Sequence, residues 1–365
     1  MIKKYFPTFS HFILLAIGLF FIFSGLIKLN DSVGFSLKIE AYLRAFASDV
    51  HKVFLEFLPY TLPIAISICI LEVVLGVALV GKFWTRLVLL ALLGLTLFFT
   101  LLTLYTLWFK RVDSCGCLSE AIPLTPLQSF IKNILLLLIL GWLIRKRELP
   151  SSTCTLLTQT GLLILATACS FFIGWYTLRN LPIIDFGYYK IGTYIPHLTQ
   201  PQKPLRYQYW LEKDGITTAS DTYPMDGAFR LIKTELLNPA DRPLVTNFTI
   251  WNENKEITQE ILQGIKLLCI VKHPRQLTNE AYSLLQAGMQ QSSQRIDLLW
   301  LLPFHEAKES LPMEARSQVG WGSADLLQSM IRANIGFILL QNGAIMGKWS
   351  DKNLSKLREA FMQLK

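Results

Sequence analysis

The 365-residue chain has few charged residues. Asp, Glu, Lys and Arg make up 17% of it, against about 25% in an ordinary soluble domain. Hydrophobic residues make up 52%, and the mean hydropathy is +0.39. This composition excludes an intrinsically disordered chain and argues against a protein that is soluble throughout.

Acidic residues are scarcer than basic ones, so the formal net charge is +9. Residues 1–150 hold fourteen Lys and Arg against eight Asp and Glu, a net charge of +6, whereas residues 151–365 carry +3. The excess therefore flanks apolar runs. Because no basic stripe with interleaved aromatic residues occurs outside the loops, we expect no nucleic-acid partner.

Five apolar runs approach or exceed the length of about 20 residues that a helix needs to cross a bilayer. They cover residues 11–29, 60–80, 87–109, 129–144 and 156–178. The first run is too long for a cleaved signal peptide, and no small-x-small cleavage site follows it, which favours a membrane anchor. Contact with membrane lipid follows from these runs.

Basic residues in the short loops predict the orientation of these spans. Lys3, Lys4, Lys82, Arg86 and residues 145–147 fall on one side, although Lys110 and Arg111 fall on the other. We therefore expect a multi-pass protein of the cytoplasmic membrane with its N-terminus inside and residues after 178 in the periplasm. Segment 30–59 alternates charged and apolar residues, which predicts an amphipathic helix on the outer surface.

Cysteine is also sparse, and no Cys-x-x-Cys motif occurs. Four of the six cysteines, at positions 69, 154, 169 and 269, are interpreted as small hydrophobic residues. The remaining two, Cys115 and Cys117, form a Cys-Gly-Cys motif in the outward loop between the third and fourth runs. Glycine supplies the backbone freedom that a small disulfide ring needs, and strained disulfides exchange readily.

Three hypotheses fit the Cys-Gly-Cys motif. The preferred one is redox exchange, in which Arg111 favours a thiolate and Asp113 opposes it. The others are a static loop staple and a two-thiolate clip for a soft ion such as Cu(I). His273 and His305 lack ligand spacing, so we predict neither a metal site nor a cofactor.

Glu72 lies far from either end of the second apolar run, where an ionisable group is costly and a functional candidate. Lys28, near the outer end of the first run, and Lys132, near the outer end of the fourth, are its possible partners. A salt bridge that joins helices and a proton-handling role are equally favoured interpretations. Gly76 and Gly81 are expected only to permit close helix packing.

These residues together resemble the MauE/DoxX family of redox-associated membrane proteins. The resemblance covers roughly residues 8–178 and rests on Phe23-Ser-Gly-Leu-Ile-Lys28 with Asp31, Glu72 with Gly76 and Gly81, Asp113-Ser-Cys-Gly-Cys117, and Lys132-Asn133. It implies a helical bundle that assists disulfide chemistry or the maturation of exported proteins, as MauE does in methylamine utilisation, with Cys115 and Cys117 at the redox position. Leu118-Ser119-Glu120 departs from the usual Phe-Gly-Asp. After residue 178, Arg179-Asn-Leu-Pro-Ile-Ile-Asp-Phe186 followed by Tyr189-Lys-Ile-Gly192 resembles a long, Bacteroidetes-type subgroup with an extra outer domain.

Residues after 196 have the composition of a soluble domain. Asp214-Gly215 and Asn342-Gly343 predict β-hairpin turns. Further strands are expected at 229–237, 244–251, 267–271 and 296–302. Helices are expected at 279–290, at 324–332 with Ser323 as N-cap, and at 351–364 with Ser350 as N-cap. The order β-α-β-α-β-β-α is similar to a thioredoxin-like core, but Lys272 and His273 stand where such a domain carries its cysteines.

The fold class predicted is an all-α transmembrane bundle followed by an exported α/β or α+β domain. The expected domains are the bundle at 1–180, a β-rich connector at 181–262 and a thioredoxin-like domain at 263–365. The preferred function is thiol–disulfide exchange, which would make the protein a thiol–disulfide oxidoreductase. The expected partners are an exported client protein and a redox partner. The alternative is a non-enzymatic membrane scaffold or chaperone whose exported domain binds a partner protein. A small transporter that uses Glu72 is a third hypothesis, disfavoured by the absence of paired broken helices.

Overall fold

The computed structural model describes residues 6–109, 124–146, 149, 151–213, 215–223, 229–272, 285, 295–304, 308–309 and 311–363. The chain divides into two compact units, residues 1–187 and residues 188–365. The first is helical, and the second contains two β-sheets. The predicted class, a helical bundle followed by an α/β domain, is therefore confirmed.

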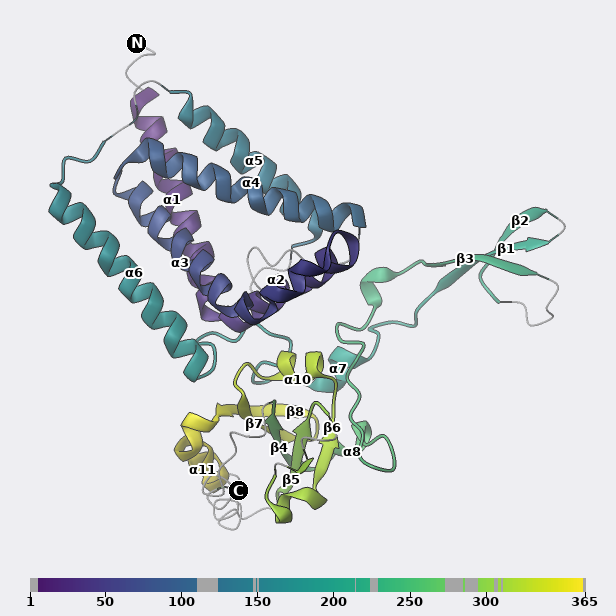
Figure 1. Ribbon diagram of the computed structural model, residues 1–365. Helices are drawn as coiled ribbons and strands as arrows, with labels where there is room; N and C mark the ends of the chain where they lie inside the picture. The colour runs from purple at the N-terminus through teal and green to yellow at the C-terminus, as the bar shows by residue number, and fades with distance from the viewer. Residues whose placement is uncertain are drawn as a thin grey trace. The chain divides into compact units, whose positions relative to one another are not determined.

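Five helices of the first unit are long and apolar enough to cross a membrane, which confirms the five predicted spans (Figure 1). They are α1 (Phe6–Asn30), α3 (Thr61–Val80), α4 (Thr85–Phe109), α5 (Pro126–Ile144) and α6 (Leu156–Arg179). Within the unit, α1 packs against α3, α4 against α5, and α6 against α3. Outward-facing apolar side chains such as Leu157, Ile164 and Phe171 are exposed, as contact with lipid requires.

The segment between α1 and α3 forms two helices rather than the single amphipathic helix expected. Asp31 begins α2 (Ser32–Asp49) by accepting a hydrogen bond of 2.8 Å from the amide of Gly34. The helix ends at Asp49 because His51 is extended and its ring accepts from the amide of Val53, which starts the 3₁₀-helix Lys52–Tyr60. The amphipathic segment therefore has a bend between two shorter helices.

The second unit is built on a five-stranded sheet of order β6-β5-β4-β7-β8. Its strands are β4 (Ile265–Val271), β5 (Asp297–Leu302), β6 (Val319–Trp321), β7 (Ile335–Gln341) and β8 (Ala344–Ser350). Strand β4 pairs in parallel with β5 and antiparallel with β7. Successive residues of β4 are fully buried, so both faces of this sheet are covered. On one face, α11 (Leu354–Gln363) places Leu357 and Phe361 against Trp300 and Phe337.

A smaller sheet of order β2-β1-β3 precedes it in the chain. The strands β1 (Tyr207–Lys213) and β2 (Ile216–Ser220) form the hairpin that Asp214-Gly215 predicts, and β3 (Arg230–Leu236) pairs with the other edge of β1. Among the described residues, the other helices are α7 (Ile195–Thr199), α8 (Thr258–Ile261), α10 (Ala324–Met330) and the 3₁₀-helices Pro239–Asp241, Met313–Ser317 and Asp351–Asn353.

Two expectations for this unit need correction, and one strand was missed. Segment 244–251 is not a strand: Ile250 is buried, but its amide donates to the hydroxyl of Thr258 rather than to a strand ladder. The short edge strand β6 was not predicted. Ser350 ends β8 and makes no capping hydrogen bond, whereas Ser323 caps α10 as expected. The helix predicted at 279–290 lies, apart from Leu285, outside the described residues.

Candidate functional site

A buried ion pair between α1 and α3 is the principal polar feature of the described part of the bundle. The ammonium Nζ of Lys28 lies 2.5 Å from the carboxylate Oε1 of Glu72, and each side chain is only 1% exposed. Lys28 stands in the last turn of α1. The structure therefore joins two of the three intramembrane charges that the sequence singled out.

Glycine residues let the two helices approach closely enough to form this pair. A Cβ atom added at Gly76 would lie 2.7 Å from the carbonyl oxygen of Gly18, and one added at Gly25 would lie 2.8 Å from that of Cys69. Real Cβ atoms do not come this close to backbone. Because Gly18 and Gly25 are seven residues apart, they share one face of α1, and this face packs on α3.

Two aromatic rings also lie beside the Lys28 ammonium. Its Nζ lies 5.3 Å from the ring centroid of Phe35 and 4.9 Å from that of Phe99. Both distances are within the range of a cation–π contact. The cation is thus stabilised by the Glu72 carboxylate and by the faces of two buried rings, one from α2 and one from α4.

The second carboxylate oxygen of Glu72, Oε2, is buried and has no hydrogen-bond partner among the described residues. One turn earlier on α3, the thiol of Cys69 is fully buried beside the pair. A carboxylate with one oxygen paired and one unsatisfied is costly in a membrane interior. The arrangement can hold α1, α2, α3 and α4 in register.

Lys132 on α5 lies elsewhere. Its Nζ is 5.6 Å from the ring centroid of Phe20, and its side chain is half-buried. The described contacts thus place Lys132 with an α1 aromatic ring and Glu72 with Lys28. The neighbouring residue Asn133 is buried, and its side-chain amide nitrogen has no hydrogen-bond partner among the described residues.

Cys115 and Cys117 lie outside the described residues. The four described cysteines are free thiols: Cys69 and Cys269 are buried, while Cys154 and Cys169 are exposed. Burial raises the pKa of Cys269, the one cysteine of the second unit, well above its usual value. In the described part of the chain, no group of three or more His, Cys, Asp or Glu side chains could hold a metal ion.

Sequence reasoning identified the two charges but not the groups that surround them. Phe35 and Phe99 gave no signal, because the chain has 23 phenylalanines and most simply fill apolar space. Gly18 and Gly25 could have been found from their spacing of two helical turns on the same face as Lys28.

The fold and this site define a multi-pass membrane protein whose helical bundle is followed by a separate α/β unit. Residues 6–146 match the family model of the methylamine utilisation protein MauE. The match spans α1 to α5 and includes the buried ion pair, so the resemblance of this part of the chain to the MauE/DoxX family is confirmed. Comparisons with curated proteins and with solved structures gave no match.

Proposed function

We propose that this membrane protein takes part in thiol–disulfide exchange during the maturation of exported proteins, through Cys115 and Cys117. The observation that carries the proposal is the Cys-Gly-Cys motif between α4 and α5, within the region that matches the MauE family. Two thiols this close in sequence favour a small ring that opens and closes.

The exchange moves two electrons and two protons. A thiolate of one protein attacks a sulfur of the other protein's disulfide, a mixed disulfide forms, and the second thiolate resolves it. If the pair starts oxidised, the client dithiol becomes a disulfide and the pair becomes a dithiol. A separate redox partner then takes up the two electrons and restores the pair; with a reduced pair every step runs in reverse.

The proposed orientation places the N-terminus in the cytoplasm and the second unit in the periplasm. The basic residues at 3–4, 82, 86 and 145–147 support it, because short cytoplasmic loops are enriched in Lys and Arg. Under this orientation Cys115 and Cys117 face the oxidising side of the cytoplasmic membrane, where disulfides persist. The division into a bundle at 1–180, a connector at 181–262 and a final domain at 263–365 belongs to the same proposal.

We further propose that residues 263–365 form a thioredoxin-like domain that binds a client and does not itself exchange disulfides. The strand order β5-β4-β7-β8, parallel and then antiparallel, supports the first part. Cys269 supports the second part: its thiol is 0% exposed, and desolvation raises its pKa, so it cannot reach a client disulfide as a thiolate.

Trapping of a mixed disulfide tests the thiol chemistry directly. In cells, a maleimide–polyethylene glycol reagent should reveal both reduced and oxidised forms of the pair. Cys117→Ser should accumulate a mixed disulfide through Cys115, because the resolving thiol is lost. Cys169→Ser is the matched control, since Cys169 is an exposed thiol on α6. The proposal fails if neither thiol is ever found reduced and the double Ser variant retains full activity.

The second candidate function is a membrane scaffold or chaperone without redox chemistry. The buried, inert thiol of Cys269 favours it, because the second unit then contributes only a binding surface. This function predicts that removal of residues 196–365 abolishes activity, whereas replacement of Cys115 and Cys117 by Ser leaves activity unchanged.

A further inference from the structure

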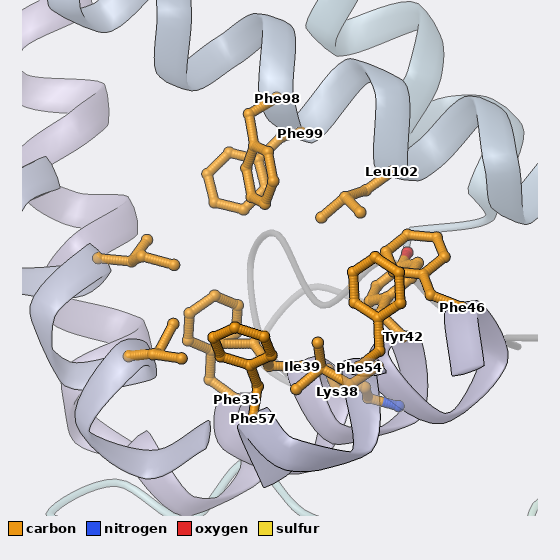
Figure 2. Close-up of a pocket in the computed structure, with 13 residues that line it drawn as sticks. Phe35, Lys38, Ile39, Tyr42, Phe46, Phe54, Phe57, Phe98, Phe99 and Leu102 are labelled. Atoms are coloured by element: carbon orange, nitrogen blue, oxygen red, sulfur yellow. The ribbon is translucent and has the colours of Figure 1, made fainter. Parts of the chain in front are cut away.

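An apolar cavity of about 270 Å³ lies between α2, the 3₁₀-helix Lys52–Tyr60, α3 and α4. Of its thirteen lining residues, eleven have pure hydrocarbon side chains. Figure 2 shows Phe98, Phe99 and Leu102 projecting into it from α4, opposite Phe35 and Phe57. Phe57 and Phe98 are each 48% exposed, so the cavity is open at its rim.

The cavity lies in one half of the membrane span. Phe98 and Leu102 precede the end of α4 at Phe109 by eleven and seven residues, which is about 10–17 Å at 1.5 Å per residue. On α3, Ile64 and Ile68 lie within the first two turns. The cavity therefore opens at the depth of one lipid leaflet, on the side of the membrane where α2 lies.

Lys38 on α2 is the one charged residue in the lining. Its ammonium lies at the edge of the cavity, away from Phe98 and Phe99 (Figure 2). The hydroxyl of Tyr42, the other polar group of the lining, is hydrogen-bonded to Thr106 at 2.8 Å. The interior consequently offers hydrocarbon surface, and its edge offers a positive charge.

We propose that this cavity binds one acyl chain of an anionic phospholipid, whose phosphate contacts Lys38. The volume is nearly twice the roughly 150 Å³ of an apolar cavity that admits benzene, so it takes more than a single ring. The side chains that line an empty apolar cavity lack van der Waals contacts on the cavity side, and a flexible acyl chain supplies these contacts. An isoprenoid quinone fits less well, because its two carbonyl groups would need polar partners inside the cavity.

This site is independent of the thiol chemistry and goes beyond the proposed function. It does touch the buried ion pair, because Phe35 and Phe99 line the cavity and also face the Lys28 ammonium. A bound chain therefore packs on the two rings that stabilise the cation. Occupancy of the cavity should then restrict the motion of both rings.

The test uses the full-length protein in bilayers with phosphatidylglycerol that carries a diazirine in its acyl chain. Photolabelling should concentrate on peptides that contain Phe98 to Leu102 and residues 35–57. Ile68→Trp fills the cavity and should abolish this labelling. Leu71→Trp is the matched control, because Leu71 is 46% exposed on the same helix and does not line the cavity. Leu102→Trp fills the cavity from α4. A loss of labelling in both filling variants, which lie on different helices, is not explained by misfolding of one of them.

A second measurement tests the headgroup contact. Native mass spectrometry should show one phospholipid retained per protein, with phosphatidylglycerol preferred over phosphatidylcholine. Lys38→Gln should lower that preference about fivefold, which corresponds to about 1 kcal/mol for one lysine near an anionic surface. The proposal is overturned if both filling variants are labelled like the wild type. It is also overturned if the preference is unchanged in Lys38→Gln, or if the molecule lost from the filling variants is a quinone.

Discussion

Separating Lys28 from Glu72 should destabilise the bundle more than replacing both residues together. Lys28→Met leaves a carboxylate that is 1% exposed without its partner, and Glu72→Gln leaves an equally buried ammonium without its carboxylate. Breaking a buried pair from one side costs about 3–5 kcal/mol. Replacing both members by uncharged groups of similar volume is often neutral, and at times stabilising by about 1–4 kcal/mol.

The expected shifts in melting temperature follow from these energies. Each single variant should lower the Tm of the bundle by at least about 6–12 °C, taking about 2–4 °C per kcal/mol for a unit of this size. The double variant should recover most of this loss. The double-mutant cycle should therefore give a coupling energy above about 2 kcal/mol, because each single change leaves one uncompensated charge.

Cys69 provides a local probe for the measurement. Its thiol is fully buried one turn from Glu72, so alkylation during a thermal ramp reports opening at the ion pair. The Cys69 peptide can be quantified by mass spectrometry in the purified full-length protein. Arg44→Met is the control: Arg44 pairs with Glu40 at 2.7 Å but is 60% exposed, and its loss should cost at most about 1 kcal/mol.

Either of two results would refute this role of the ion pair. The first is a free energy of unfolding of both single variants within about 1 kcal/mol of the wild-type value, because breaking the pair would then leave no costly buried charge. If the double variant loses the sum of the two single losses, each residue acts alone, and the pair does not hold α1 against α3.

Three further predictions concern other parts of the structure. Gly76→Ala should destabilise the bundle by about 1–3 kcal/mol, because its Cβ would lie 2.7 Å from a backbone oxygen; thermal unfolding of the protein in detergent measures this. Asp297→Asn should reduce the stability of the second unit near neutral pH. It should also flatten the acid limb of the stability curve, the fall in the free energy of unfolding as pH decreases. A hydrogen bond from Lys266, 2.7 Å long, lowers the pKa of Asp297, so its contribution is present above its unfolded pKa near 4 and is lost as pH falls through the folded pKa. Gly343→Ala should cost about 1–2 kcal/mol, since φ is +80° there, and limited proteolysis of the hairpin reports it.

Gly76→Ala has a matched control, and each of the three predictions has an outcome that would contradict it. Gly94→Ala should be neutral or slightly stabilising, because nothing lies within 4 Å of an added Cβ at Gly94. Equal losses at Gly76 and Gly94 would contradict the close approach. An acid limb that is unchanged in Asp297→Asn would contradict the role of Lys266. Undiminished protease resistance of Gly343→Ala would contradict the strained turn.

Much of the fold could be predicted because its signals are local in sequence. The five spans are long apolar runs, and Asn342-Gly343 forms a turn in which both residues adopt positive φ, as this dipeptide favours. Segment 244–251 was wrongly predicted to be a strand, because that prediction also used only local sequence. Val245, Phe248 and Ile250 are buried, but the amide of Ile250 donates to the side chain of Thr258, eight residues later, and Trp251 pairs with Trp321 in an isolated bridge rather than in a ladder.

The candidate site was only partly accessible to such reasoning. Glu72 and Lys28 stand out in sequence because a charge inside an apolar run is rare. Phe35 and Phe99 could not be distinguished from the other phenylalanines, because their role depends on α2 and α4 meeting beside α1. The acyl-chain cavity is hidden in sequence for the same reason.

By itself, the amino-acid sequence determined that the chain crosses a membrane five times and ends in an α/β unit, because hydropathy and turn chemistry act over a few neighbouring residues. Only the tertiary structure decided which charges meet. Glu72 had two possible partners in sequence, and the close approach of α1 to α3 at Gly25 and Gly76 brought Lys28 to it. Helix packing places residues 44 positions apart at hydrogen-bonding distance, and no local pattern encodes that contact.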